Sequence, residues 1–290
     1  PEPVEPNKVE VAPAPPPNRP QPPVKPALAK SRWTPLVKMS PGTQTTRPLF
    51  LIHGARGNVL WFKPFVDRLK DGPPIYGVEA QGIDGTLPFL ETIEEMAALY
   101  VRHLLKVDPK GPYRLVGYSG GGVIAIEMAH QLKLSGRKVE LLVMLDSLAP
   151  QAAERPVSLM EKLRYMRHLG SPYLMHRFQQ RFSALGEAAR QRLATGREED
   201  GKSHIEVLSE RSEVVYIEAQ RRYRPPVYDG DVVMFRASRA SAMFVRSGPI
   251  LGWQGSLTGN VDVIPLDAYH DSLMHEPAIN VVVEEVRRRL

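Results

Sequence analysis

One serine in this chain stands in a pattern that makes serines nucleophilic. Residues 117–121 read GYSGG, directly after the apolar run 113–116 and directly before the amphipathic run 123–128. This is G-x-S-x-G between a strand and a helix, a sharp turn that lifts the serine side chain clear at a helix N-terminus. The glycines permit a strained serine backbone and a close approach of strand and helix. Ser119 is therefore predicted to be a nucleophile, and Gly120, the next residue, to offer a backbone N–H to an oxyanion.

A serine hydroxyl attacks well only when a histidine takes its proton and a carboxylate holds that histidine in one tautomer. In chain order the acid should follow the serine and precede the histidine. Asp146 closes the apolar run 139–145, one predicted strand after the nucleophile. Because parallel sheets keep their sites at the C-terminal ends of their strands, Asp146 is predicted to be the acid rather than a turn or helix-cap residue.

The base is one of eight histidines. His53 comes directly after the first predicted strand, His270 lies in a loop after the last one, and His275 lies at the edge of the closing helix. A base must reach the nucleophile from a loop, so His270 is predicted, with His275 as the alternative. The other five fall on predicted helices or in a helical insertion, where surface or packing roles are expected: His103, His130, His168, His176 and His204.

A second oxyanion donor should come from the loop after the first predicted strand. That loop begins with the pair His53 and Gly54, and the H-G motif of hydrolases is a template for it. Ala55 is predicted to donate its N–H, with Arg56 as the near alternative. No side chain in the loop decides between the two donors.

Elements that alternate along the chain would bring these residues together. Continuously apolar strands that alternate with helices indicate a parallel sheet covered on both faces. From about residue 157 to 224 the alternation stops, and the composition predicts an insertion of helices over one end of the sheet. The predicted strands are 49–53, 75–79, 113–117, 139–146, 231–237 and 261–266, and the predicted helices are 60–70, 91–106, 121–134 and 276–290.

Composition excludes several classes of protein. The 290 residues contain no cysteine, which rules out disulfide scaffolds, zinc-cysteine sites and cysteine nucleophiles. No apolar run approaches 18 residues and no leader pattern is present, so we expect a cytoplasmic protein with no membrane span. The net charge of +6 is concentrated in residues 1–47 and 151–224, without a compact basic patch that includes aromatic residues. Nucleic-acid binding is therefore not expected.

The first residues have a different composition from the rest. Eleven of the 28 prolines fall in residues 1–26, which hold almost no aromatic or branched apolar side chains. Such a stretch favours extended polyproline II and cannot build a core. Because the chain starts with Pro1 rather than Met, residues 1–32 are predicted to be a linker to another domain, and residues 33–290 a single globular domain.

Three segments together resemble a known family. They are 48–54 (PLFLIHG), 75–82 (IYGVEAQG) and 111–121 (GPYRLVGYSGG), and residues 127–129 and 145–147 continue the likeness. They are similar to the thioesterase domain that ends modular polyketide synthases and nonribosomal peptide synthetases. The resemblance implies an α/β-hydrolase fold with a helical lid at about 151–224, and a triad of Ser119, Asp146 and His270.

The resemblance also implies a substrate and a partner. The acyl chain would arrive as a thioester on the phosphopantetheine arm of an upstream acyl or peptidyl carrier domain, and the enzyme itself would need no bound cofactor or metal. Release would occur by hydrolysis or cyclisation. One alternative is a free-standing carboxylesterase or lipase with the same triad, and another is a hydrolase-fold binding module without activity.

Overall fold

The structure is a computed structural model that describes residues 33–42, 46–154, 160, 203–239 and 242–290. The predicted proline-rich linker, residues 1–32, lies outside the described residues. So does most of the predicted lid insertion, residues 155–159 and 161–202. The site residues predicted from the sequence, Ser119, Asp146, His270, Ala55 and Gly120, are all described.

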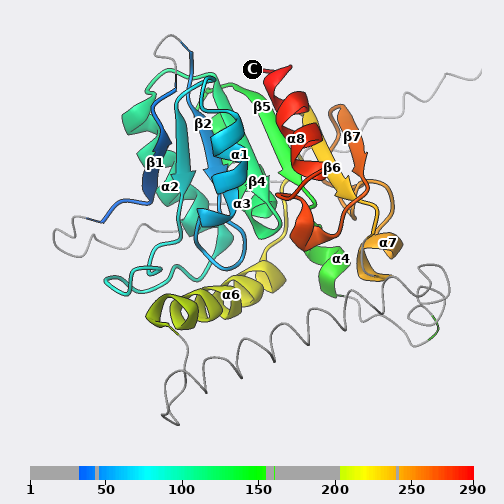
Figure 1. The fold of residues 1–290 in the computed structure, drawn as a ribbon. Coiled ribbons are helices and arrows are strands. Elements are labelled where there is room, and N and C mark those ends of the chain that lie inside the picture. Colours follow the sequence, from blue (N-terminus) through cyan, green and yellow to red (C-terminus); the bar gives the residue numbers. More distant parts are fainter. Residues whose placement is uncertain (1–32, 43–45, 155–159, 161–202, 240–241) are drawn as a thin grey trace, which may run out of the picture.

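A seven-stranded sheet runs through the domain in the order β1-β3-β2-β4-β5-β6-β7 (Figure 1). All neighbouring strands are parallel except β1 and β3, which pair antiparallel. This mostly parallel sheet with helices on both faces is the predicted fold class. The strands are β1 Leu36–Ser40, β2 Leu49–Ile52, β3 Ile75–Val78, β4 Tyr113–Tyr118, β5 Val139–Leu145, β6 Val232–Ala237 and β7 Val261–Leu266.

Among the strands in the described part of the chain, β1 is the one that the sequence analysis missed. It pairs only with β3, at the edge of the sheet, and two of its five residues are exposed. An edge strand open to solvent on one side lacks the continuous apolar run that identified the buried strands. Its short LVKMS sequence therefore carries little signal.

Two apolar layers sandwich the sheet. Helices α2 (Ile93–Val107) and α3 (Gly120–Leu134) pack on one face, and α1 (Lys63–Arg68) and α8 (Ala278–Arg287) on the other (Figure 1). Helix α3 has buried residues over most of its length, because it also packs against α2 and against β4 and β5. The position of α3 fixes the turn at Ser119, which joins the end of β4 to the start of this helix.

Several of the described helices differ from the predicted ones. Helix α2 starts at Ile93, two residues after the predicted start, because the Thr92 hydroxyl accepts a hydrogen bond from the Glu95 N–H. The predicted helix 60–70 divides into a short 3-10 turn, Leu60–Phe62, and α1. The five-residue helix α7, Ala242–Arg246, was not predicted, because so short a helix has almost no periodicity to detect.

Two described helices belong to the predicted insertion. The short helix α4 (Pro150–Glu154) lies at its start, and the long helix α6 (His204–Arg222) lies at its end. Ser203 and Glu206 form a capping box that starts α6. The helix lies across the end of the sheet where the parallel strands finish (Figure 1). Among the described helices, none combines the length and the apolar character that a membrane crossing requires.

Candidate active site

Ser119 stands in a strained turn between β4 and α3. Its backbone has φ 52° and ψ −119°, a combination that is sparsely populated by residues with a side chain. Gly117 and Gly121 make the turn feasible. A Cβ on Gly117 would lie 2.4 Å from the Gly121 carbonyl oxygen, and one on Gly121 would lie 2.4 Å from backbone oxygens at the end of β2. Only glycine fits at these two crossings, as the GYSGG pattern predicts.

Asp146 follows β5 directly, and its side chain is fully buried. Its backbone N–H donates to the Phe235 carbonyl oxygen at 2.8 Å, and its Oδ1 accepts from the Ala237 N–H at 3.0 Å. Both partners belong to β6, the neighbouring strand. The carboxylate is thereby fixed in the sheet, with Oδ2 free to face the next residue of the site.

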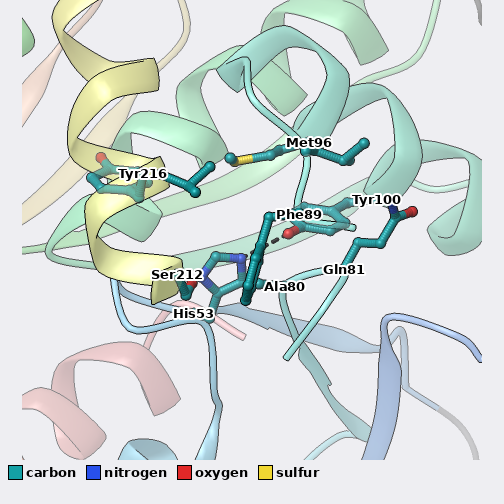
Figure 2. Close-up of a pocket in the computed structure, with 10 residues that line it drawn as sticks. His53, Ala80, Gln81, Phe89, Met96, Tyr100, Ser212 and Tyr216 are labelled. Carbon is teal, nitrogen blue, oxygen red and sulfur yellow. Dashed lines mark hydrogen bonds between the residues drawn. The ribbon is translucent and has the colours of Figure 1, made fainter. Parts of the chain in front are cut away.

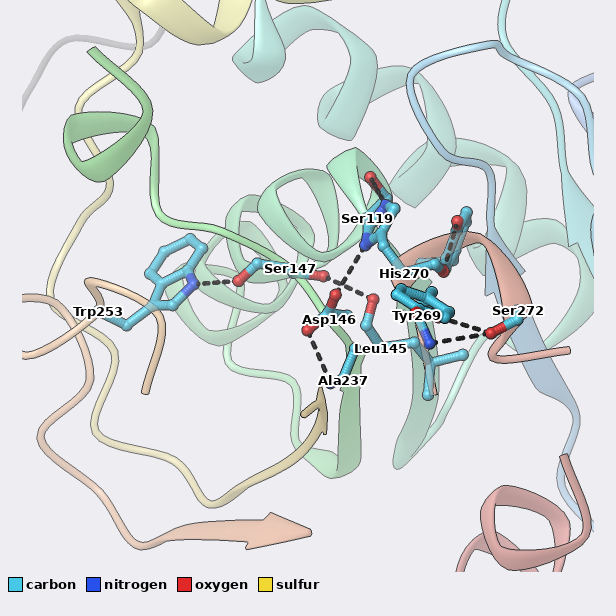
Figure 3. Close-up of polar contacts among 10 residues, drawn as sticks. Ser119, Leu145, Asp146, Ser147, Ala237, Trp253, Tyr269, His270 and Ser272 are labelled. Carbon is cyan, nitrogen blue, oxygen red and sulfur yellow. Dashed lines mark hydrogen bonds and ion pairs between the residues drawn. The ribbon is translucent and has the colours of Figure 1, made fainter. Parts of the chain in front are cut away.

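His270 joins the acid to the serine (Figure 3). Its Nδ1 lies 2.8 Å from Oδ2 of Asp146, and its Nε2 lies 3.0 Å from Oγ of Ser119. The histidine begins a 3-10 turn, His270–Ser272, in the loop between β7 and α8. Three side chains that are far apart in the sequence thus form one hydrogen-bonded line, in the order that general-base activation of a serine requires.

Two residues that could compete with the predicted base and acid lie elsewhere. His275 is exposed, and its ring meets the edge of Trp61 with 6.1 Å between centroids. Asp267, another acid near the predicted base, is also exposed, and Arg239 binds both its oxygens at 2.7 and 2.8 Å. That guanidinium holds the pKa of the Asp267 carboxyl below its usual range. In the described structure neither residue contacts Ser119.

Two aromatic rings hold the imidazole of His270. Tyr118 stacks on it with 5.1 Å between centroids, and Phe244 from α7 lies 5.3 Å away. The Tyr118 hydroxyl also donates to the His270 carbonyl oxygen at 3.1 Å. The sequence analysis assigned no role to either ring. Tyr118 is the first x of the G-x-S-x-G pattern, so its place next to Ser119 in the sequence could have indicated a role in the site. Phe244 lies in helix α7, which the sequence analysis did not predict.

The loop after β2 forms a tight turn beside the serine. The Gly57 N–H donates to the Gly54 carbonyl oxygen at 3.0 Å, which places Ala55 and Arg56 at its two central positions. Ala55 is half-buried, whereas Arg56 is exposed. Within the described residues, no backbone carbonyl outside the regular helices and strands accepts from the N–H groups of Ala55 and Gly120, so both stay candidate donors.

His53 contacts the first carbonyl of this turn, and Figure 2 shows its ring beside Tyr100. Its Nδ1 lies 2.6 Å from the Gly54 carbonyl oxygen, and its Nε2 lies 2.7 Å from the Tyr100 hydroxyl. A neutral ring with the proton on Nδ1 satisfies both contacts, by donating to the carbonyl and accepting from the phenol. Burial lowers the pKa of His53 to about 4, and the contact with Gly54 opposes that shift only partly.

We therefore expect the neutral state of His53 to make the fold sensitive to acid. The unfolded chain protonates this histidine below its ordinary pKa of 6.5, whereas the folded chain resists until about 4. The free energy of unfolding should fall as the pH drops through that window, by about 1.4 kcal/mol per pH unit from this residue.

Urea unfolding at pH 7 and pH 5 measures this sensitivity. His53→Gln, whose amide can both donate and accept, should lose less stability on acidification than the wild type. Burial also lowers the pKa of His103 to about 4, so the comparison is made in a His103→Gln background. Equal losses with and without His53 would contradict the expectation.

The fold and the strained turn at Ser119 between β4 and α3 place this chain in the α/β-hydrolase class. A family model of the thioesterase domain matches residues 47–279, most of the chain. The chain therefore belongs to the thioesterase domain family, as its sequence resemblance predicts. The solved structures that resemble it include the NocB thioesterase domain in covalent complex with a fluorophosphonate nocardicin G analog. That likeness has a TM-score of 0.62 and 25% identity, and it covers 84% of this chain and 95% of the other.

Curated relatives come from large biosynthetic enzymes. A dimodular nonribosomal peptide synthase of Bacillus subtilis is 29% identical over 78% of this chain and 10% of its own length. Malpibaldin synthetase of Mortierella alpina is 26% identical over 84% of this chain and 4% of its own length. The polyketide synthase PksR of Bacillus subtilis is 40% identical over 35% of this chain and 4% of its own length. The chain thus spans a tenth or less of these relatives.

Proposed function

We propose that this domain releases an acyl chain, a polyketide or a peptide, from the phosphopantetheine thioester of a carrier protein through an acyl-enzyme on Ser119. The observation that carries the proposal is the hydrogen-bonded line from Asp146 through His270 to Ser119, in a chain of the thioesterase family. The fixed geometry supports these three residues as the catalytic triad. Release follows by attack of water or of a nucleophile within the chain.

The first half of the reaction acylates the serine. His270 Nε2 takes the proton of the Ser119 hydroxyl while Oγ attacks the thioester carbonyl carbon. The carbonyl oxygen gains the negative charge, and the N–H groups of Ala55 and Gly120 donate to it. As the C–S bond breaks, the carbonyl reforms and the imidazolium returns the proton to the departing pantetheine sulfur. The carrier leaves with a free thiol, and the acyl chain stays on Ser119 as an ester.

The second half releases the chain by the same steps in reverse order. His270 takes a proton from water, or from a hydroxyl or amine of the acyl chain itself, as that group attacks the ester. Collapse of the second tetrahedral intermediate returns the proton to Ser119 Oγ. Asp146 keeps the Nδ1–H of His270 in place throughout and stabilises the imidazolium.

The proposed partner is a carrier domain that precedes this one in a longer protein. The support is that the curated relatives include a dimodular nonribosomal peptide synthase and a polyketide synthase. These relatives do not favour a free-standing carboxylesterase. We further propose that residues 1–32 are the linker to that carrier, that the insertion at about 151–224 acts as a lid, and that the protein works in the cytoplasm. Neither a bound cofactor nor a metal is needed for the chemistry above.

A pair of matched substrates tests the proposal. The wild-type chain is given an acyl N-acetylcysteamine thioester and the ethyl ester of the same acid. We expect kcat/KM for the thioester to be higher, and an excised carrier domain loaded with the same acyl group to be unloaded as well. A preference for the oxygen ester, with no unloading of the carrier, would overturn the proposal in favour of a carboxylesterase.

Asp146→Asn tests the acid. The amide favours the wrong tautomer of His270, and we expect kcat for thioester hydrolysis to fall by about four orders of magnitude. The side chain keeps its size, so the unfolding midpoint should change little. Asp267→Asn is the matched control, an acid in the loop of His270 that is bound to Arg239 instead, and its kcat should stay within about twofold of wild type. A larger loss in Asp267→Asn would assign the acid to that residue.

A further inference from the structure

Two hydroxyl groups of helix α6 reach the loops that carry the proposed oxyanion donors. The Ser212 hydroxyl donates to the Ala55 carbonyl oxygen at 3.1 Å, and the Tyr216 hydroxyl donates to the Gly120 carbonyl oxygen at 3.0 Å. The two residues are four apart, so they lie one above the other on the same face of the helix (Figure 2). Both are nearly fully buried. One helix thus contacts both the loop after β2 and the first residue of α3, on either side of the nucleophile turn.

The contact at Ala55 completes a clamp on that residue. A trans peptide points its C=O and its N–H in opposite directions, so the Gly54 carbonyl fixes the direction of the Ala55 N–H. The His53 ring and the Gly57 N–H hold that carbonyl. Ser212 holds the next peptide through the carbonyl of Ala55 itself. With both flanking peptides fixed, Ala55 has little freedom to turn its N–H away from the site.

The contact at Gly120 has the same form. The Ser119 carbonyl, in the peptide that bears the Gly120 N–H, accepts from the Gly122 N–H at 3.1 Å. Tyr216 holds the following peptide through the Gly120 carbonyl. Its ring also packs on the α-carbon, because a Cβ on Gly120 would lie 2.5 Å from the ring. Glycine is the residue most able to rotate here, and Tyr216 restrains it.

Further contacts fix α6 against the body of the domain. At its C-terminal end the hydroxyl of Tyr223 donates to the buried carboxylate of Glu127 on α3 at 2.7 Å. Burial raises the pKa of that carboxyl. The buried residues of α6 and its C-cap follow one side of the helix: Leu208, Ser209, Ser212, Tyr216, Ala219 and Tyr223. The helix is therefore packed firmly enough to impose a position on the two loops.

We propose that Ser212 and Tyr216 are positioning residues that set the two oxyanion donors from one helix of the insertion. The inference rests on the proposed function, because it takes the N–H groups of Ala55 and Gly120 as the donors. It assigns to α6 a part in catalysis itself. An oxyanion hole works through donors that are aligned before the charge develops, so a loosened donor weakens the transition state more than the bound substrate.

The test uses Tyr216→Phe and Ser212→Ala, each of which removes one hydroxyl and leaves a buried carbonyl without its donor. We expect kcat/KM for an acyl N-acetylcysteamine thioester to fall by about tenfold in each variant, per active site counted by end-point labelling with a fluorophosphonate. Phenylboronic acid forms a tetrahedral adduct on the serine, so its affinity should fall by a similar factor. A variant that only unfolds more readily would lose labelled sites but keep the wild-type affinity for the boronic acid.

Two variants serve as controls. Tyr223→Phe removes a phenol hydroxyl from the end of the same helix, but its partner is Glu127, and the other buried residues still hold α6 in place. Stability should therefore drop while kcat/KM per labelled site stays within about twofold of wild type. Ser212→Thr keeps a hydroxyl and should restore activity that Ser212→Ala loses.

The outcomes separate this inference from the proposed function. If the wild type prefers the thioester and unloads the loaded carrier, and Ser119→Ala does neither, the proposed function stands whatever α6 does. If Tyr216→Phe and Ser212→Ala then match the wild type in kcat/KM and in boronic acid affinity, the positioning role is wrong. Equal losses in Tyr223→Phe would also overturn it, since the effect would then be one of helix packing alone.

Discussion

Ser119→Ala is expected to lower kcat for thioester hydrolysis by about five to six orders of magnitude and to abolish the acyl-enzyme. Removal of the nucleophile in a serine hydrolase leaves only the rate enhancement from the oxyanion donors and from binding. The fold should persist, because the change removes one hydroxyl and alanine keeps the same backbone restrictions at φ 52°. Mass spectrometry after incubation with an acyl thioester should show an added acyl mass on the wild type alone.

Ser135→Ala is the matched control, at the opposite end of α3. Its hydroxyl donates to the Leu132 carbonyl oxygen at the helix C-terminus, remote from the site. It should form the acyl-enzyme at the wild-type rate. An adduct that persists in Ser119→Ala would place the nucleophile on another residue and end the assignment.

His270→Gln is expected to be comparably damaging, with a loss of about five orders of magnitude or more in kcat. Glutamine has a similar length and can fill the space between Tyr118 and Phe244, but it cannot take the proton of Ser119. Single-turnover measurements with the thioester should show that acylation itself has slowed. The rate of labelling by a fluorophosphonate should fall in parallel.

The comparison with His275→Gln decides between the two histidines that the sequence left open. His275 is exposed and touches the edge of Trp61, so its loss should change kcat by less than about twofold. If His275→Gln were instead the inactive variant, the loop would have to rearrange to bring that ring to Ser119. The hydrogen bonds of His270 to Asp146 and Ser119 would then belong to a resting state only.

The parts of the site that the sequence could predict are those with a local signal. GYSGG between an apolar run and an amphipathic run defines the turn, because the close crossings at Gly117 and Gly121 exclude any larger side chain. The place of Asp146 at the end of a buried strand led to its selection, and its contact with His270 agrees with that choice, while its role as the acid stays a prediction. The choice of His270 needed only the rule that a base comes from a loop, but its distance to Ser119 depends on how β7 and α8 pack.

Contacts between distant segments were beyond the sequence. Ser212 lies 157 positions from Ala55 and Tyr216 lies 96 from Gly120, so no periodicity or motif links them. On sequence alone they are ordinary buried positions of an amphipathic helix. Strand β1 was missed for a different reason. It lies at an exposed edge of the sheet, where backbone pairing with β3 forms the strand without an apolar pattern in the sequence.

The pairing of β5 with β6 bears on how such domains can diversify. The segment between them leaves the end of β5 and returns at the start of β6, whereas Asp146 bonds to Phe235 and Ala237 toward the end of β6, so these bonds join the two strands independently of that segment. Loop closure entropy grows only slowly with length, so chains of very different size can be exchanged between these fixed ends at little cost. The hydrogen bonds among Ser119, Asp146 and His270, and those of Asp146 to β6, all join residues outside the range 155–202. A graft that also replaced α6 would have to bring its own equivalents of Ser212 and Tyr216.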